Sequence, residues 1–271
     1  MKILFLGDIV GDSGCIAVKK HLKTIIEKNK IEFVIANGEN AAINGVGITE
    51  DILKDLFNYG INVVTTGNHV WDHKETLGLV EKENRLLRPL NLIGNSPGKG
   101  FNIFNFSKNF KICVLNLMGN VFMKKSEDVF KISENFMKLH TLKKNYDFLV
   151  VDIHCETTSE KMAMGHFFDG KATFVVGTHT HVPTSDTMIL KEGTAYQTDA
   201  GMCGDYNSVI GMQKEVPINR FLGKISKERL KPANGEATIC GVVIETYETT
   251  GLAKKITPLR FGGKLIEKWP S

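Results

Sequence analysis

Short apolar runs followed by polar turns recur along the first half of the chain. They occupy residues 3–6, 33–36 and 61–64, and each leads into a turn that contains glycine. Residues 18–26 and 52–57 repeat apolar side chains at helical spacing, with Asp12 or Ser13 as the candidate cap of the first helix and Thr49 of the second. Strands therefore alternate with helices, which predicts a largely parallel sheet.

The later part of the chain has a different pattern. Apolar runs at residues 112–117, 148–153 and 174–176 predict further strands, and residues 129–139 predict a helix capped by Ser126. After residue 187 the pattern is β-like, with little helical spacing beyond the glycine-rich loop 201–211, in segments 188–190, 194–197, 238–245 and 255–259. These last segments predict a second sheet packed on the first. Because no linker, repeat or low-complexity tail interrupts the chain, we expect one domain over residues 1–271.

Composition and charge exclude several classes of protein. The net charge of +4 comes from 34 basic and 30 acidic residues without a dense basic block, and no basic stretch is interleaved with aromatic residues. This argues against a dedicated nucleic-acid surface. No apolar stretch approaches the roughly 20 residues that span a bilayer, so we expect a cytoplasmic protein that does not enter the membrane. The five cysteines are scattered and never form Cys-x-x-Cys, which disfavours disulfides and a thiolate zinc site.

Polar residues stand where the predicted strands end. The residues at such positions are Asp8, Glu39, Asn40, Asn68, His69, His154, His179 and His181. In open α/β sheets, ligands bind beyond the carboxyl ends of the strands. Asp8, Glu39 and Asn68 recur at intervals of about 30 residues, one βαβ unit, so adjacent strand ends would bring them together. Each could be a helix cap or a turn residue by itself, but turn chemistry does not explain three histidines at strand ends.

The types of these side chains point to metal chemistry. If the strand before His179 simply continued, His179 and His181 would share one face, because side chains alternate across a strand. Imidazole and carboxylate ligands suit Fe, Mn and Zn, whereas an all-oxygen set favours Mg or Ca. Two divalent ions, two carboxylates and a bridging hydroxide leave a site charge of roughly +1, which suits phosphate. The chemistry indicated is phosphoester hydrolysis.

The ordered motifs resemble the calcineurin-like metallophosphoesterase superfamily. This sequence departs from that pattern where Val10 replaces histidine, Glu39 replaces the bridging aspartate, Val70 replaces an acid and Thr178 is inserted. With these departures, the sequence resembles one bacterial branch of the superfamily, the YmdB-type 2',3'-cyclic-nucleotide 2'-phosphodiesterases. The similarity extends over essentially the whole chain, through the segments "FLGDIVG", "ANGENAA", "TTGNHVWD", "TSEKMAMG", "VVGTHTHVPT" and "TDAGMCG".

The resemblance implies a fold, cofactors and residue roles. The fold is α/β, a layered sandwich of two mixed β-sheets flanked by helices. The cofactors are two divalent or mixed-valence transition metal ions, with iron preferred and manganese or zinc as alternatives. The implied ligands are Asp8, Asn40 and His181 on one ion, Asn68, His154 and His179 on the other, and Glu39 as the bridge. A metal-bridging hydroxide would attack phosphorus, and His69, oriented by Asp72 or a backbone carbonyl, would protonate the leaving oxygen.

The expected activity is that of a metal-dependent phosphodiesterase on a small-molecule phosphoester. Its substrates would be 2',3'-cyclic nucleotides, 3',5'-cyclic nucleotides or related phosphodiesters. Two alternatives stay open: a phosphatase acting on nucleotides or phosphoproteins, and a regulatory RNA-associated protein that retains the fold. The intact ligand set and His69 argue against loss of catalysis. The branch also suggests assembly into a homo-oligomer.

Overall fold

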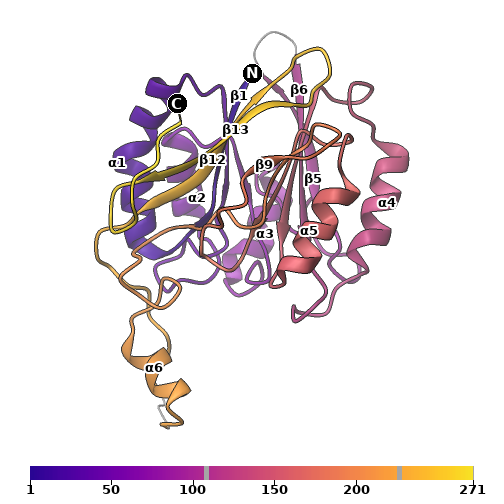
Figure 1. Ribbon diagram of the computed structural model, residues 1–271. Helices are drawn as coiled ribbons and strands as arrows, with labels where there is room; N and C mark the ends of the chain where they lie inside the picture. The colour runs from indigo at the N-terminus through magenta and orange to yellow at the C-terminus, as the bar shows by residue number, and fades with distance from the viewer. Residues whose placement is uncertain (107–109, 225–227, 271) are drawn as a thin grey trace.

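Two β-sheets form the centre of the molecule in the computed structural model, which describes residues 1–106, 110–224 and 228–270 (Figure 1). The first sheet has the order β13-β12-β1-β3-β4, with β1 (Lys2–Leu6), β3 (Phe33–Asn37), β4 (Val63–Thr65), β12 (Ile239–Thr246) and β13 (Ala253–Phe261). The second has the order β5-β6-β7-β8-β10-β9, with β5 (Phe101–Phe106), β6 (Phe110–Met118), β7 (Phe148–His154), β8 (Phe174–Thr178), β9 (Met188–Ile189) and β10 (Ala195–Gln197). A short parallel pair joins β2 (Asp8–Ile9) to β11 (Met202–Cys203).

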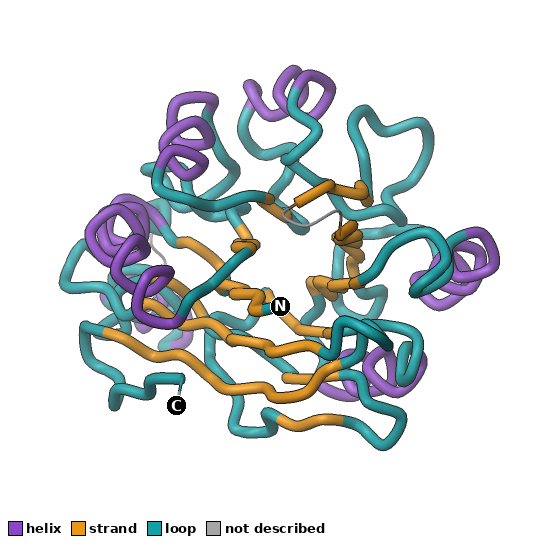
Figure 2. Tube along the Cα trace, turned by 90° about the horizontal axis from the view of Figure 1, so that it is seen from above, coloured by secondary structure: helices purple, strands orange, loops and turns teal. Residues whose placement is uncertain are grey.

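Helices cover the outer faces of both sheets, as the view from above shows (Figure 2). The helices are α1 (Gly11–Asn29), α2 (Glu50–Asn58), α3 (Lys74–Lys82), α4 (Val129–Leu139), α5 (Thr158–Phe167) and α6 (Glu215–Phe221). Apolar side chains of α1, α2 and α3 pack on the first sheet, and those of α4 and α5 pack on the second. The predicted layered sandwich of two mixed sheets flanked by helices is confirmed.

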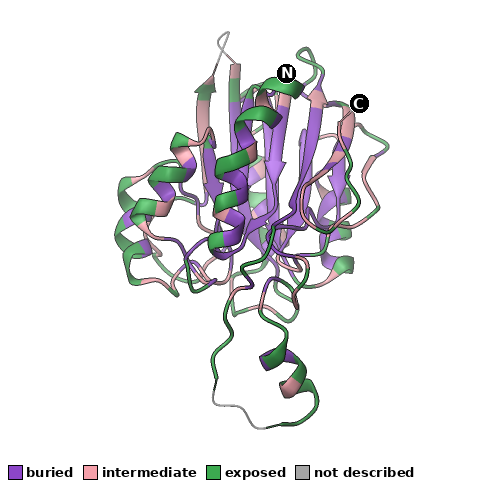
Figure 3. Ribbon diagram, turned by 90° about the vertical axis from the view of Figure 1, so that its left-hand side faces the viewer, coloured by how far each residue is buried: buried purple, intermediate pink, exposed green. Residues whose placement is uncertain are grey.

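Alternation along β1 shows how the layers are held together. Ile3 and Phe5 lie in the cluster between the two sheets, whereas Leu4 and Leu6 lie in the cluster beneath the helices. All four side chains are buried, because both faces of the sheet are covered (Figure 3). This explains why the strand is a continuous apolar run rather than an alternating one.

The prediction that the four C-terminal segments build the second sheet is wrong for the last two and holds for the first two. β12 and β13 extend the first sheet, where β12 pairs antiparallel with β1. β9 and β10 join the second sheet, where β10 pairs parallel with β8. The second sheet is built largely from β5 to β8, earlier in the chain. Long-range pairing decided this, since a strand's apolar pattern does not specify its partner. The sequence analysis also missed β5, α3, α5 and α6.

Two of the three predicted helix caps are wrong. Thr49 caps α2 as predicted, because its side chain accepts a hydrogen bond from the amide of Ile52 at 3.3 Å. The helix α1 begins at Gly11, so Asp12 and Ser13 lie in its first turn rather than before it. Asp128 rather than Ser126 caps α4, where its side chain accepts from the first free amides.

An extension carrying α6 projects from the molecule at the end opposite the N-terminus (Figure 1). Because β1 starts at the N-terminal end and β3 and β4 run parallel to it, the extension lies on the side of their carboxyl ends. This is also the edge that holds the polar residues singled out above. Within the described ranges, no helix combines the length and apolarity needed to cross a membrane.

Candidate metal centre

The eight predicted site residues lie at the carboxyl ends of strands from both sheets. Three strand ends of the first sheet, β1, β3 and β4, are neighbours, and so are β7 and β8 of the second. The first sheet contributes Asp8, Glu39, Asn40, Asn68 and His69, and the second contributes His154, His179 and His181. The expectation that strand ends bring these residues together is confirmed as geometry, and the site straddles the two sheets.

One group of donor atoms converges on the imidazole of His154. Its Nε2 lies 2.9 Å from Oε1 of Glu39, 3.0 Å from Oδ1 of Asn68 and 3.0 Å from Nδ1 of His179. Donor atoms of Glu39, His154 and His179 all lie within 4.8 Å of one another. Two imidazoles, a carboxylate and an amide oxygen suit a divalent transition metal.

Thr178 fixes the orientation of His154. Its hydroxyl donates to Oδ1 of Asp152 at 2.7 Å and lies 2.9 Å from Nδ1 of His154. Because that hydroxyl has one proton, it accepts from the Nδ1–H of His154, which leaves Nε2 for a metal ion. Asp152 is buried and also accepts from Thr65 and Asn37. The insertion of Thr178 thus supplies the link that orients a candidate ligand.

A second group surrounds Asp8. Oδ1 of Asp8 and Oδ1 of Asn40 are buried and have no hydrogen-bond partner within the described part of the chain. The amide nitrogen of Asn40 donates to the carbonyl of Gly45 at 2.8 Å, so its oxygen is the free atom. His181 donates from Nδ1 to the carbonyl of Ile210 at 2.8 Å, and its Nε2 lies 3.8 Å from Asp8 Oδ1. Buried oxygens without donors are costly, so this group fits a cation.

The protonation states of Glu39 and His179 suit metal coordination. Burial opposes the charged form of His154, but the charge and hydrogen bond of Glu39 and the charge of Asp8 raise its pKa to about 9, so a metal ion at Nε2 would have to displace a proton. Burial opposes ionisation of Glu39, but the charge and hydrogen bond of His154 and the proximity of His69 lower its pKa to about 2. Burial and the charge of His154 lower the pKa of His179 to about 3. At neutral pH Glu39 is therefore a carboxylate and His179 a neutral imidazole, the forms that bind metal ions. Burial raises the pKa of Asp8 despite the attraction of His181 and His154, because a buried carboxylate is disfavoured in its charged form.

His69 lies at the edge of this group and is held by Asp72. Its Nδ1 lies 2.6 Å from Oδ2 of Asp72, and its backbone amide donates to Oε2 of Glu39 at 3.0 Å. Lys124 contacts the same loop, donating to Oδ1 of Asp72 at 3.2 Å and to the carbonyl of Asn68 at 2.6 Å. Of the two partners left open for His69, the structure places Asp72 against its ring.

His179 and His181 do not continue the strand. β8 ends at Thr178, and both histidines have left-handed backbone conformations, with φ of 98° and 65°. Such conformations cost roughly 1–3 kcal/mol each for residues other than glycine and persist only where the surroundings hold them. The turn carries His179 to His154 and His181 to Asp8. His179 and His181 therefore do not share one face of a strand, as a continued strand would have required. They contact different groups of side chains instead.

A buried ion pair holds this turn in place. Nζ of Lys161 lies 2.7 Å from Oδ2 of Asp199, and both side chains are fully buried. The same oxygen accepts from the amide and hydroxyl of Thr180, which stands between the two histidines. The sequence analysis gave no role to Lys161, Asp199 or Asp152. The signals were nonetheless present: Lys161 and Asp199 lie in "TSEKMAMG" and "TDAGMCG", and Asp152 precedes His154 by two on a strand.

We expect Lys161→Met to lower the free energy of unfolding by about 3–5 kcal/mol, because it leaves the buried carboxylate of Asp199 unpaired. Urea unfolding followed by circular dichroism measures this loss. Lys23→Met, which changes an exposed lysine of α1, should stay within about 0.5 kcal/mol of the wild type. Equal stability of the Lys161 and Lys23 variants would show that the pair does not hold the turn.

A cavity of about 350 Å³ opens beside the candidate metal centre, lined among others by Glu39, Asn40, His69, His179 and His181. Its size lies in the range of roughly 300–1,000 Å³ that is usual for small-molecule sites. The convergent polar groups, their shifted pKa values and the cavity thus coincide, which marks this as the candidate active site.

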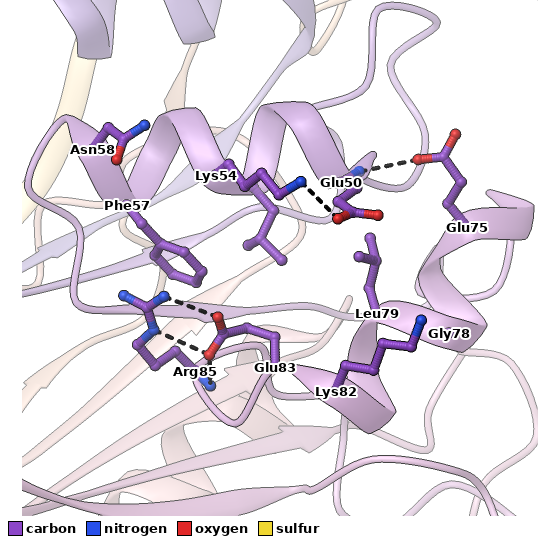
Figure 4. A pocket seen from close by; sticks show the side chains of 11 residues that line it. Glu50, Lys54, Phe57, Asn58, Glu75, Gly78, Leu79, Lys82, Glu83 and Arg85 are labelled. Carbon is purple, nitrogen blue, oxygen red and sulfur yellow. Dashed lines mark hydrogen bonds and ion pairs between the residues drawn. The ribbon is translucent and has the colours of Figure 1, made fainter.

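A larger cavity of about 640 Å³ lies between α2 and α3 (Figure 4). Arg85 donates to Glu83 at 2.9 and 3.0 Å, and its guanidinium carbon lies 3.7 Å from the ring centroid of Phe57. Nζ of Lys54 lies 2.7 Å from Glu50. These charged groups are satisfied by one another, so size alone does not make this cavity a site.

Comparisons with known proteins cover nearly the whole chain. A family model described as "YmdB-like protein" matches residues 4–259. The chain is 41% identical over 256 residues to the 2',3'-cyclic-nucleotide 2'-phosphodiesterase of Bacillus subtilis (strain 168), covering 94% of this chain and 95% of that protein.

Two solved structures are also similar. A hypothetical protein from Thermus thermophilus superposes with a TM-score of 0.89 and 38% identity, over 97% of this chain and 100% of that one. A Mycoplasma pneumoniae protein described as a novel phosphatase superposes with a TM-score of 0.89 and 36% identity, over 100% and 95%. The chain therefore belongs to the YmdB-like family, as the motifs resembling that branch predicted.

Proposed function

We propose that the chain is a two-metal phosphodiesterase that hydrolyses 2',3'-cyclic nucleotides, with His69 as the proton donor. The convergence of Glu39, Asn68 and His179 on Nε2 of His154, beside the free buried oxygen of Asp8, carries the proposal. The name of the Bacillus subtilis relative supports the choice of substrate, and relatives from two Mycoplasma species are described as putative phosphatase/phosphodiesterase.

The ligand sets proposed for the two ions follow the two groups of donor atoms. Asn68, His154 and His179 would hold one ion, Asp8, Asn40 and His181 would hold the other, and Glu39 would bridge the two. When bound, two such ions would activate water and stabilise charge on the phosphoryl oxygens. Amide oxygens from Asn40 and Asn68 suit an anionic substrate, because further carboxylates would cancel the positive charge that attracts phosphate.

The proton transfer is proposed for His69. Its Nδ1 is engaged by Asp72, so Nε2 is the nitrogen left to protonate the leaving oxygen. Lys124 holds the far oxygen of Asp72, and the amide of His69 is tied to Glu39. His69 is therefore oriented from two sides, as required for a proton donor that must meet the substrate in a fixed geometry.

We expect the purified protein to carry about two transition metal ions per chain and to open 2',3'-cyclic AMP. Elemental analysis measures the metal, and assays on 2',3'-cyclic AMP, 3',5'-cyclic AMP and bis(p-nitrophenyl) phosphate measure hydrolysis before and after chelation. Chelation should abolish activity, and added Mn²⁺ or Fe²⁺ should restore it. Absence of both bound metal and metal-dependent hydrolysis would refute the proposal, and turnover confined to phosphomonoesters would favour a phosphatase.

A further inference from the structure

The side chains that line the cavity beside the candidate metal centre fall into two chemical sets, which we call its polar wall and its apolar wall. One wall carries the polar residues described above. The other carries the apolar side chains of Val46, Ile210, Met212 and Leu230, together with Arg229. None of these five side chains is fully buried, and Leu230 is 39% exposed and Ile210 54%. Apolar side chains exposed within a cavity that also holds convergent polar groups are typical of small-molecule sites.

Arg229 and Leu230 come from the projecting extension, whose described residues 213–224 and 228–231 we call the arm (Figures 1 and 3). Backbone hydrogen bonds close its base, from Gln213 to Lys231 and from Ala233 to Gly211, each 2.8 Å long. The carbonyl of Ala233 also accepts from Ser13 of α1 at 3.1 Å. The arm is thus rooted in the main body at the edge where the strand ends converge.

The apolar wall is also tied directly to a candidate metal ligand. His181 donates from Nδ1 to the carbonyl of Ile210, and Ile210 has a left-handed backbone with φ of 45°. The next residue but one, Met212, pairs with Pro232 in an isolated bridge at the base of the arm. The hydrogen bond between His181 and Ile210 therefore connects the two walls, so a ligand bound to one wall has a defined position relative to the other.

The guanidinium of Arg229 is available for a ligand. It makes no hydrogen bond or ion pair with any residue in the described part of the chain, unlike Arg220 of the same arm, which donates to the carbonyl of Glu228 at 3.3 Å. A guanidinium offers five donors in a plane and stacks on aromatic faces. These properties match a nucleobase, which has a π face and hydrogen-bonding edges.

We propose that Arg229 and Leu230, with Val46, Ile210 and Met212, form a subsite for the nucleoside part of the substrate. The phosphate would lie against Glu39, His69 and His179, and the base against the arm. This inference rests on the proposed function, because it assumes that the polar wall receives the phosphate. It adds a consequence: the arm selects nucleotides over small phosphodiesters that present no base.

The test compares Arg229→Ala with the wild-type holoenzyme. For 2',3'-cyclic AMP, KM should rise about tenfold with kcat nearly unchanged, the size of one lost charge-assisted or cation–π contact. For methyl p-nitrophenyl phosphate, which carries no nucleoside, kcat/KM should stay within about twofold. Lys231→Ala removes one positive charge two residues further along the arm but none from the cavity lining, and should behave as the wild type.

Calorimetry provides a readout that does not depend on turnover. Adenosine 3'-monophosphate should bind Arg229→Ala about tenfold more weakly, whereas binding of inorganic phosphate should not change. Equal weakening of both ligands would assign Arg229 to the phosphate and overturn the nucleoside subsite, and so would an unchanged affinity for both. A wild-type protein that hydrolyses no phosphodiester, yet binds the nucleotide through Arg229, would remove the proposed function and leave the subsite standing.

Discussion

His69→Ala should keep its metal ions and lose about 100- to 10,000-fold in kcat, the usual contribution of a positioned general acid. The substitution removes the imidazole but keeps the backbone amide that donates to Glu39, so the ligand loop should hold its conformation. Elemental analysis and steady-state kinetics on 2',3'-cyclic AMP measure the two effects separately. Wild-type turnover in this variant would exclude His69 as the proton donor.

Two further variants make this result specific. Asp72→Asn should give a smaller loss of about 10- to 100-fold with unchanged metal content, because it removes the charge that holds Nδ1 of His69 at 2.6 Å. His166→Ala, which changes an exposed histidine at the end of α5, should match the wild type. A loss in Asp72→Asn as large as that in His69→Ala would mean that Asp72 has a role of its own.

Glu39→Gln should lose both metal and activity, with kcat lower by about 1,000-fold or more, since several kcal/mol of charge stabilisation depend on the metals. Glutamine keeps the size of the side chain and the hydrogen bond from the His69 amide, but it lacks the negative charge that Glu39 places 2.9 Å from Nε2 of His154. Metal content per chain and residual turnover are the measurements.

Glu83→Gln is the matched control for Glu39. It removes a carboxylate from the larger cavity between α2 and α3, where Glu83 pairs with Arg85. This variant should keep wild-type metal content and kcat, which would also show that the larger cavity is not the active site. Full metal occupancy in Glu39→Gln would exclude Glu39 as the bridge.

Much of the site could be predicted from local sequence. The strands that position Asp8, Glu39 and Asn68 are apolar runs ending in polar turns, and their spacing matches successive βαβ units. Adjacent parallel strands β1, β3 and β4 then place those residues side by side. The layered fold and the family were also correctly predicted, because the ordered motifs extend over most of the chain.

The errors have a common cause in contacts between distant segments. β12 pairs with β1 although more than 200 residues of sequence separate them. The apolar pattern of a strand does not indicate which sheet the strand belongs to. Ser126 was predicted to cap α4, but Asp128 is the cap, because the side chain of Asp128 accepts from the free amides of Phe130 and Lys131. The arm was missed because α6 spans seven residues, too short for a clear helical period.

The sequence by itself determined which side chains stand at strand ends, and therefore the chemical kinds of group available at that edge. Only the tertiary structure decided that the two sheets share one site, that His179 and His181 turn towards different donor groups, and that Lys161 and Asp199 hold that turn. The physical reason is that a residue's position along a strand is set locally by side-chain periodicity. Its partners across sheets depend on packing between segments far apart in the chain.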